Sequence, residues 1–534
     1  MDRRTFIKGV AGAGSLAMSG GLAMPALAQG AAKTLHFVPQ ANLANFDPIW
    51  GTQYVVRNAS ALVWDMLYGL DASGTPQRQM VESEEVSADG LTWTFKLRPG
   101  LKFHDGEKVL AKDVVASLTR WSARDPMGIM IKASQKELVA VDDTTFRWVL
   151  SKPFPKMKLA LGKTNAPIAF IMPERIAQTD PFKQITEYVG SGPTKFLKGE
   201  WVPGAKAVFE RFADYVPRSE APSWLAGGKK MLVDRIEWVV MPDPATAAAA
   251  LQNGEVDWWE QPLPDLVPLL KGNKNLNVDI GDPLGNVGSF RMNHIQPPFN
   301  NPKVRQAVLM ALSQEDYMRA VAGDDEKLWK VLPGFFTPGT ALYTEVGGEV
   351  LKSGKGNLEA AKKLLKESGY NNEPVVCVVA QDQPITKAQG DVTVDLLKKL
   401  GMNVDFVATD WGTVGARRAL KTPPTQGGWS MFHTWHAGAD CTNPAAYPAI
   451  RANGDKAWFG WPESPAVEAE VVSWFDAKDL AEEKAAIGRL NKAAVENVTY
   501  APTGFFLSYT AWRKTVSGVT QGPLPFFWGV SKSA

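Results

Sequence analysis

Residues 234–259 read DRIEWVVMPDPATAAAALQNGEVDWW, and this stretch decides the fold class. Its first seven residues alternate as a strand does, and Asp243 and Pro244 can cap and begin an Ala-rich helix. Gly254 ends that helix, after which the last five residues resume an extended pattern. A strand, a helix and a strand in this order predict a parallel sheet covered by helices.

A second unit of the same kind lies at residues 375–407. Residues 375–380 form an apolar strand, the helix that follows ends at Gly401, and residues 403–407 form the next strand. One face of the helix carries Val392, Leu396, Leu397 and Leu400. Two such units predict two α/β lobes.

Residues 91–150 have a different pattern, which predicts a separate α+β subdomain. The stretches 91–97 and 144–150 alternate as half-exposed strands do, and they flank a helix predicted at 111–121. Two α/β lobes with an inserted α+β piece suggest a ligand that is held between lobes able to hinge.

The first 28 residues have the features of a signal peptide. Arg3 and Arg4 precede a Gly/Ala-rich apolar stretch, which makes the segment twin-arginine-like. The Ala-Leu-Ala segment 26–28 predicts cleavage before Gln29. The alternative is a membrane anchor, which needs roughly 20 strongly apolar residues. We expect an exported, soluble mature chain, and no cysteine follows the cleavage site to carry a lipid.

Charge argues against nucleic acid as a partner. Without residues 1–28, the basic residues fall from 58 to 55 and the acidic residues from 56 to 55, so the mature net charge is about zero. No later run of Lys and Arg is longer than a pair, whereas a nucleic-acid binder needs a basic stripe to neutralise phosphates.

Two further features of the composition bear on the fold and the site. Cys377 lies inside an apolar run and is expected to be a buried strand thiol, while a disulfide with Cys441 is left open. The 19 tryptophans exceed what packing demands, and amphipathic aromatic rings suit a cleft that holds an organic solute.

Several motifs follow one another over nearly the whole mature chain. They are DGLTWTFKLRPGLKFHDG at 89–106, AKDV at 111–114, GSGP at 190–193, NGEVD at 253–257, PPFNNPKVRQAV at 297–308 and AAKKLLKESGY at 360–370. With these motifs in this order, the chain resembles the extracellular solute-binding protein family 5, which includes peptide- and nickel-binding proteins of ABC importers.

The resemblance implies a two-lobed, periplasmic-binding-protein-like α/β fold with an inserted α+β subdomain, giving three subdomains in a pear shape. The expected division is a signal peptide at 1–28, the main part of lobe I at 29–64, 188–287 and 505–534, the inserted subdomain at 65–187, and lobe II at 288–504. It also implies a periplasmic protein that delivers its ligand to an ABC permease of the inner membrane with a cytoplasmic ATPase.

Most of these motifs have an architectural interpretation. His104 is expected to be a structural histidine with satisfied hydrogen bonds, next to turns in which glycine supplies the backbone conformation. The segment 190–193 lacks the geometry of a dinucleotide loop because of Pro193, and it is expected to be a turn that joins lobes or lines a cleft.

A search for catalytic motifs finds none. The sequence contains no His-Glu-x-x-His helix, no Gly-x-Ser-x-Gly elbow and no phosphate loop, and it has five histidines in all. We therefore expect no enzyme, no catalytic residue, no cofactor and no bound metal. A secreted hydrolase remains a remote alternative.

The richest candidate site is residues 429–444, WSMFHTWHAGADCTNP, an aromatic strand that runs into a loop of small residues. Trp435, His436 and Asp440 are its candidate ligand-binding residues. By the resemblance, Asp440 pairs with the α-ammonium of a peptide ligand. The alternative role for Asp440 is to cap a turn.

Four more candidates follow from position. Trp259 and Trp411 come at or just after the carboxyl ends of strands, which is where ligands bind in parallel sheets. Arg417, beside Arg418, can clamp a carboxylate, although paired arginines also form solvated faces. Tyr54 comes early enough to line the opposite lobe. For Trp259, Trp411 and Tyr54 the alternative is an ordinary packed core residue.

The leading hypothesis is a binder of a short peptide or similar zwitterionic solute, present as a monomer. The second hypothesis is a binder of a metal chelate, as in nickel-type relatives, or of another organic anion. His433 and His436 lie in a segment that reads as a strand, so they point to opposite faces and do not chelate a metal together.

Overall fold

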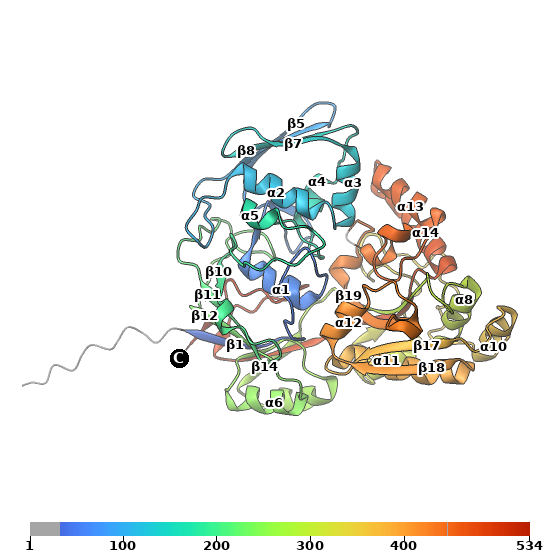
Figure 1. The fold of residues 1–534 in the computed structure, drawn as a ribbon. Helices are drawn as coiled ribbons and strands as arrows, with labels where there is room; N and C mark the ends of the chain where they lie inside the picture. Colours follow the sequence, from blue (N-terminus) through green and yellow to red (C-terminus); the bar gives the residue numbers. More distant parts are fainter. Residues whose placement is uncertain (1–32, 446, 534) are drawn as a thin grey trace, which may run out of the picture. The chain divides into compact units, whose positions relative to one another are not determined.

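The computed structural model describes residues 33–445 and 447–533, and the predicted signal peptide lies outside the described residues. Two large mixed sheets and one smaller antiparallel sheet organise this part of the chain (Figure 1). The three sheets draw their strands from different stretches of sequence, while the predicted domain boundaries themselves stay a prediction.

The largest sheet in the described chain has seven strands. In spatial order they are β10 (Thr194–Phe196), β11 (Lys206–Arg211), β12 (Arg235–Val239), β1 (Thr34–Val38), β13 (Trp258–Trp259), β21 (Tyr509–Arg513) and β14 (Leu276–Ile280). β1 pairs in parallel with both β12 and β13. The pairs on either side of this centre are antiparallel.

The second large sheet has six strands and is also mixed. In spatial order they are β16 (Trp329–Lys330), β20 (Ala501–Phe506), β15 (Asn286–Met292), β19 (Met431–Ala437), β17 (Pro374–Ala380) and β18 (Asn403–Thr409). Only β17 pairs in parallel, with β18 and with β19. The prediction of wholly parallel sheets is therefore wrong. The strands of each unit do run parallel, but distant segments add antiparallel strands to both sheets.

The third sheet is antiparallel and belongs to the α+β part of the chain. Its order is β5 (Val81–Val86), β6 (Thr92–Leu97), β8 (Thr145–Leu150) and β7 (Gln135–Ala140). Two-stranded pairs are β2 (Asp65–Met66) with β9 (Phe170–Ile171), β3 (Tyr68–Leu70) with β4 (Pro76–Arg78), and β22 (Val516–Ser517) with β23 (Ser531–Lys532). The predicted strands at 91–97 and 144–150 and the helix at 111–121 are confirmed.

Helices cover these sheets. They are α1 (Tyr54–Val63), α2 (Ala111–Trp121), α3 (Pro126–Ser134), α4 (Met157–Gly162), α5 (Glu174–Ala177), α6 (Pro244–Asn253), α7 (Val267–Lys271), α8 (Pro302–Ala311), α9 (Gln314–Ala322), α10 (Leu358–Glu367), α11 (Pro384–Leu400), α12 (Trp411–Arg417), α13 (Pro465–Asp476) and α14 (Leu480–Asn497). Short 3-10 helices are η1 (Lys198–Glu200), η2 (Pro264–Leu266), η3 (Pro424–Gln426), η4 (Gly438–Cys441), η5 (Pro448–Ile450) and η6 (Gly454–Lys456). α11 and α12 contact the six-stranded sheet, and α6 and α7 contact the seven-stranded one.

The unit at 234–259 forms β12, α6 and β13 as its residues predict. The Asp243 side chain accepts a hydrogen bond from the backbone N–H of Thr246 at 2.7 Å, which caps the helix. Gly254 ends the helix with a φ of 85°, a conformation that glycine adopts without strain. The strand β1 lies between β12 and β13, so the two strands of the unit are not direct neighbours.

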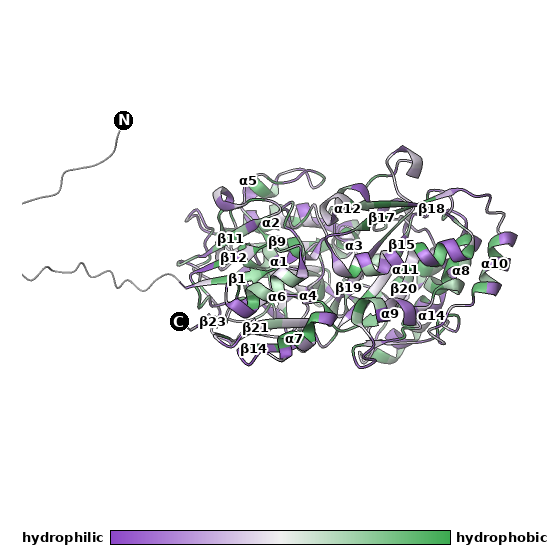
Figure 2. Ribbon diagram, turned by 90° about the horizontal axis from the view of Figure 1, so that it is seen from below, coloured by the Kyte–Doolittle hydropathy of each residue, from purple (hydrophilic) through white to green (hydrophobic). Residues whose placement is uncertain are grey.

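The unit at 375–407 forms β17, α11 and β18. β17 is apolar along its length (Figure 2), as a strand covered on both faces requires. Of the predicted face of α11, Leu397 and Leu400 are fully buried, while Val392 and Leu396 are partly buried. Cys377 is a buried free thiol inside β17, and Cys441 is also buried and free.

Much of the tryptophan content fills the core. Among the largest fully buried side chains are Trp64, Trp121, Trp148, Trp238, Trp429 and Trp474. Only a minority of the tryptophans are therefore left for the cleft role that the composition suggests. Within residues 33–445 and 447–533, none of the helices has the length and apolarity that crossing a bilayer requires.

His104 and the segment 190–193 pack together. The His104 Nδ1 accepts a hydrogen bond from the Gly190 N–H at 3.1 Å, so Nε2 carries the proton and donates to the Gly192 carbonyl at 3.0 Å. The structural role predicted for His104 is confirmed. Gly192 donates a hydrogen bond to the Val63 carbonyl at the end of α1, and the expected lobe-joining or cleft-lining role of the turn stays a prediction.

Replacing Gly190 by alanine is expected to destabilise the protein. A Cβ at Gly190 would lie 1.9 Å from the Val63 carbonyl oxygen, which is backbone and cannot move aside freely. We expect a loss of about 1–3 kcal/mol or more in the free energy of unfolding, as for other overpacked sites. The measurement is urea unfolding followed by circular dichroism.

The matched control is Gly199→Ala, since a Cβ there meets no atom within 4 Å. It should change the free energy of unfolding by no more than about 0.5 kcal/mol. Equal stability of the two variants would contradict the close packing of Gly190 against α1.

Candidate functional site

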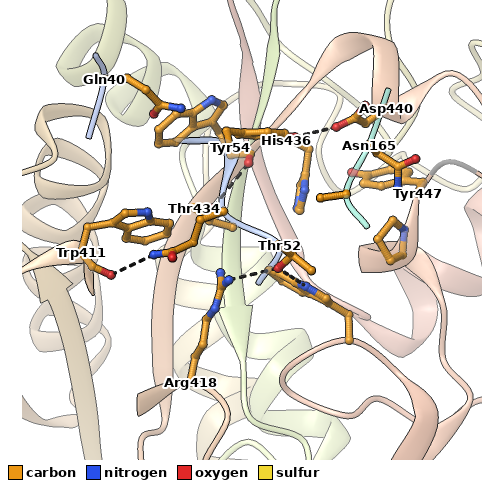
Figure 3. A pocket seen from close by; sticks show the side chains of 15 residues that line it. Gln40, Thr52, Tyr54, Asn165, Trp411, Arg418, Thr434, His436, Asp440 and Tyr447 are labelled. Atoms are coloured by element: carbon orange, nitrogen blue, oxygen red, sulfur yellow. Dashed lines mark hydrogen bonds between the residues drawn. The ribbon is translucent and has the colours of Figure 1, made fainter. Parts of the chain in front are cut away.

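One pocket gathers five of the seven predicted ligand-binding residues: Tyr54, Trp411, Trp435, His436 and Asp440 (Figure 3). It has about 560 Å³ of empty space, its opening to solvent included. The lining residues are Gln40, Thr52, Gln53, Tyr54, Asn165, Ala166, Trp411, Arg418, Thr434, Trp435, His436, Asp440, Tyr447, Pro448 and Trp458.

Segments far apart in sequence supply these residues. The stretch before α1 and its first residue provide one wall, and the loop that follows α4 provides Asn165 and Ala166. The opposite wall comes from α12, from the end of β19 and from the 3-10 helix η4 that continues it. Aromatic rings and buried polar groups thus meet in one concave site, the usual composition of a small-molecule site.

Asp440 is held by partners from two other segments. Its Oδ2 accepts a hydrogen bond from the Tyr54 hydroxyl at 2.8 Å, and its Oδ1 accepts one from the Thr164 hydroxyl at 3.1 Å. The Tyr54 hydroxyl also accepts a hydrogen bond from the N–H of Ala437 at 2.6 Å, so the hydroxyl both donates and accepts. These bonds join α1, the loop after α4 and the end of β19.

Arg57, one turn after Tyr54 on α1, supplies the positive charge. Its Nη1 lies 3.7 Å from Oδ2 of Asp440, and both side chains are almost fully buried. Burial raises the pKa of Asp440, and the nearby Arg57 acts in the opposite direction. Asp440 is therefore an acid whose charge is already compensated within the protein.

Two more carboxyl groups face the same arginine from the neighbouring cavity. Burial raises the pKa of Glu260 and the pKa of Asp282 to about 7 each, and Arg57 partly opposes both shifts. Glu260 accepts hydrogen bonds from the N–H of Gln40 at 2.7 Å and from the Asn58 amide at 3.1 Å. Asp282 accepts one from the N–H of Leu284, and its Oδ2 is buried without a partner.

The pocket wall contains buried polar atoms that have no partner in the described chain. They are both amide atoms of Asn165, Nε2 of His436 and Nε of Arg418. These three side chains are 3, 8 and 4 % exposed. Because an unpaired buried polar group is costly, three of them around one cavity indicate a place that a polar ligand completes.

The structure places two predicted residues outside this pocket. Trp259 lines a separate cavity together with Pro262 and Tyr509, because its ring packs in the apolar cluster that contains Ala247 and Leu251 of α6. The Arg417 Nε donates to the Gly428 carbonyl at 2.9 Å, and the neighbouring Arg418 faces the pocket instead. Successive residues of a helix point about 100° apart, so the sequence of the pair alone does not show which arginine faces the pocket.

His433 and His436 lie on opposite faces of β19, as predicted. His433 is buried against Thr393, whose hydroxyl lies 2.7 Å from Nε2, and against the Ser289 carbonyl. His436 faces the pocket beside the rings of Tyr447 and Trp458. Within the described residues no group of three or more His, Cys, Asp or Glu is arranged to hold a metal ion.

Sequence reasoning missed Arg57, Asn165, Arg418 and Trp458. The pair of arginines in the sequence predicts a ligand contact for Arg417 and does not single out Arg418. Asn165 lies in a loop with no motif, and Arg57 looks like any helical arginine. The one available signal is that Arg57 lies in a mostly apolar helix, YVVRNASALV, where a charge requires a buried partner.

Comparisons with known proteins agree on the family. Residues 75–458 match the model of the bacterial extracellular solute-binding proteins, family 5. The chain is 34% identical, over 100% of both chains, to a probable peptide ABC transporter periplasmic-binding protein of Sinorhizobium fredii.

Two solved structures share the fold. One is a periplasmic binding protein from A. tumefaciens R10 in complex with agropinic acid, with a TM-score of 0.78, 22% identity and coverage of 94% of this chain and 99% of that one. The other is a dipeptide-binding protein from Pseudoalteromonas sp. SM9913 in complex with Met-Leu, with a TM-score of 0.78, 20% identity and coverage of 94% and 100%. The family and the two-lobed α/β class predicted from sequence are confirmed.

Breaking the pair formed by Arg57 and Asp440 is expected to destabilise the protein. Asp440→Asn and Arg57→Met each remove one partner of a buried ion pair, which costs about 3–5 kcal/mol. The double variant removes both charges, so its loss should be smaller than the sum of the single losses. Urea unfolding of the three variants measures this coupling.

The control for these variants is Glu359→Gln, which breaks an exposed pair with Lys362. Its effect should stay below about 1 kcal/mol. Additive losses in the double variant would show that Arg57 and Asp440 do not stabilise one another.

Asp282 makes stability depend on pH. Since the pKa of Asp282 in the folded protein is raised to about 7, the unfolded chain ionises first as the pH rises from about 4. Stability is then lost up to about pH 7, at no more than about 1.4 kcal/mol per pH unit. Asp282→Asn removes this loss, and its new amide takes the place of an oxygen without a partner.

The difference in melting temperature between Asp282→Asn and the wild type should therefore grow, in favour of the variant, from pH 4.5 to 7. Other groups that titrate in this range cancel in the comparison. A difference that is independent of pH would contradict the shifted carboxyl.

Proposed function

Because the chain belongs to the bacterial extracellular solute-binding proteins of family 5, we propose that it is the periplasmic solute-binding component of an ABC importer. In this role it captures a short peptide or a similar small organic solute in the pocket at the end of β19. It then delivers the solute to a permease of the inner membrane that is driven by a cytoplasmic ATPase.

The observation that carries this proposal is the makeup of the pocket wall. The rings of Tyr54, Trp411, Trp435, Tyr447 and Trp458 surround a cavity in which buried polar atoms lack partners. Aromatic rings provide a large contact area for an organic solute at a small cost in conformational entropy. The unpaired polar atoms provide specificity, because a solute that satisfies them removes a penalty that the empty pocket bears.

Trp435 and Tyr54 stand side by side at this site, with ring centroids 6.2 Å apart. Tyr54 is fixed by its bonds to Asp440 and Ala437, so it presents its ring in one orientation. A solute packed against Trp435 therefore meets a rigid surface, and rigid sites lose little entropy on binding. That Asp440 pairs with the α-ammonium of a peptide stays a prediction, since Asp440 already has three partners in the protein.

The proposed setting is that of an exported protein. We propose export by the twin-arginine route, removal of residues 1–28, and action as a monomer whose two lobes and inserted subdomain close over the ligand. The family consists of solute-binding proteins, and we propose that this chain catalyses no reaction.

One alternative ligand class is favoured by His436. Its Nε2 is buried without a partner at the pocket wall, and burial lowers the pKa of His436 to about 3, which keeps the imidazole neutral. A neutral imidazole can complete the coordination of a metal that enters inside an organic chelator. Binding of nickel with histidine, but not of free histidine, would favour this class.

Loss of Trp435 is expected to weaken ligand binding. We would purify the protein, unfold and refold it to remove carried ligand, and titrate it with dipeptides and tripeptides by calorimetry. Trp435→Ala should weaken binding by at least about 2 kcal/mol, or roughly thirtyfold in Kd, as for a buried aromatic anchor.

The matched control is Trp201→Ala, a partly buried tryptophan that does not line the pocket. It should leave the Kd unchanged. Equal binding by Trp435→Ala and the wild type would place the ligand elsewhere, and turnover of a bound compound would contradict the proposal outright.

A further inference from the structure

We infer that Arg291 is a positioning residue of the solute pocket: it lies outside the pocket and fixes the wall that carries Trp458. This wall segment, residues 447–461, supplies Tyr447, Pro448 and Trp458 to the pocket. It contains the short helices η5 and η6 but no strand or α-helix of its own, so other residues must fix its course. The inference concerns the site of the proposed function and rests on that function for its ligand.

Arg291 reaches the wall segment from the middle of the six-stranded sheet. It belongs to β15, which pairs with β19 on one side and with β20 on the other. Arg291 lies opposite Phe432 of β19, so it projects from the same face of the sheet as Thr434 and His436, which line the pocket. Its long side chain is fully buried. It can therefore contact the wall segment from behind, on the side away from the solute.

The guanidinium of Arg291 binds four backbone carbonyls. Its Nη1 donates to the carbonyls of Ala449 at 2.9 Å and Thr499 at 2.8 Å, and its Nη2 donates to the carbonyl of Trp458 at 3.1 Å. Its Nε donates to the carbonyl of Phe459. Three of these carbonyls belong to the wall segment, and the fourth lies just before β20. One side chain thus ties both ends of the wall segment to the sheet.

The chemistry of this contact requires an arginine. A guanidinium presents its N–H donors on three nitrogens in one plane, whereas a lysine has its three donors on a single nitrogen. Burial lowers the pKa of Arg291 to about 9, so the group is charged at neutral pH and its hydrogen bonds are charge-assisted. A buried charge that lost an acceptor would be costly, and this cost keeps the carbonyls in place.

The same guanidinium also contacts the ring of Trp458. The guanidinium carbon of Arg291 lies 5.2 Å from the centroid of that ring, within the range at which an aromatic ring attracts a cation. On its other contacts the ring lies beside His436, with centroids 5.7 Å apart, and its Nε1 is 3.4 Å from the Thr52 hydroxyl. Arg291 holds both the carbonyl and the ring of Trp458, so a shift of Arg291 moves a surface that the solute contacts.

Arg305 of α8 provides a comparison within the same chain. It too is buried, and it donates to the backbone carbonyls of Phe299 and Asn497. None of these three residues lines the pocket. Arg305 therefore stabilises the fold by the same kind of contact as Arg291 but has no connection to the solute site.

The test compares Arg291→Lys with Arg305→Lys in the purified protein, refolded to remove carried ligand. The probes are leucyl-leucine and trileucine, titrated by calorimetry. Both variants should be less stable than the wild type. Only Arg291→Lys should bind the probes more weakly, by about tenfold, because a displaced Trp458 ring packs less well against the solute. An unchanged Kd in Arg291→Lys, or an equal loss of affinity in both variants, overturns the inference.

A double variant shows whether Arg291 acts through Trp458. Trp458→Ala removes the ring and should itself weaken binding of the probes. Adding Arg291→Lys to Trp458→Ala should then raise the Kd by less than about twofold, because the ring that Arg291 positions is gone and the two losses are not additive. A further tenfold loss in the double variant would mean that Arg291 affects binding by another route, which contradicts the inference.

Hydrogen exchange followed by mass spectrometry provides a readout that does not depend on binding. In the ligand-free wild type, peptides from the wall segment should exchange slowly, since Arg291 holds this segment before any solute arrives. Arg291→Lys should speed exchange in these peptides, and Arg305→Lys should not.

Fast exchange of the wall segment in the ligand-free wild type, with protection only when leucyl-leucine or trileucine is present, would show that the ligand orders the wall and would overturn the inference. Absence of binding by both probes counts against the proposed function alone, because the exchange measurement, which needs no variant to fold, still decides the role of Arg291.

Discussion

The pair formed by Arg57 and Asp440 is the contact on which the arrangement of the pocket depends. It joins α1, which follows the first strand of the seven-stranded sheet, to η4 at the end of β19 in the six-stranded sheet. Tyr54 and Thr164 complete the same cluster. Because neither charge is exposed, separating the two side chains is costly, and this cost holds the segments together.

This cluster explains why the pocket is polar and yet rigid. Tyr54 is oriented by two hydrogen bonds and cannot rotate without breaking its bonds to Asp440 and to the Ala437 N–H. The neighbouring carboxyls of Glu260 and Asp282 face the same arginine, and burial raises the pKa of each. Charge in this region is therefore arranged around one cation, and the remaining charge of the pocket is that of Arg418.

Arg418 differs from Arg57 because no carboxylate of the described chain pairs with it. Arg57 contributes to stability because its counter-ion is part of the chain, whereas Arg418 has aromatic neighbours and a single hydroxyl partner. A buried polar atom without a partner lowers the stability of the empty protein, and a ligand that satisfies such an atom regains that free energy on binding. Asn165 and His436 line the same cavity, and they too have buried polar atoms without a hydrogen-bond partner in the described chain.

The sequence by itself determined the local elements and the family. The Asp243 cap, the glycines at 254 and 401 and the apolar run of β17 act over a few residues, so periodicity and turn chemistry were enough to predict them. Trp435, His436 and Asp440 were found because they follow one another in a single strand and loop. Only the tertiary structure decided that both sheets are mixed, that Arg418 rather than Arg417 faces the pocket, and that Asp440 is already paired with Arg57. These outcomes depend on contacts between segments hundreds of residues apart and on the direction in which each side chain leaves its helix, and neither is encoded in a local pattern.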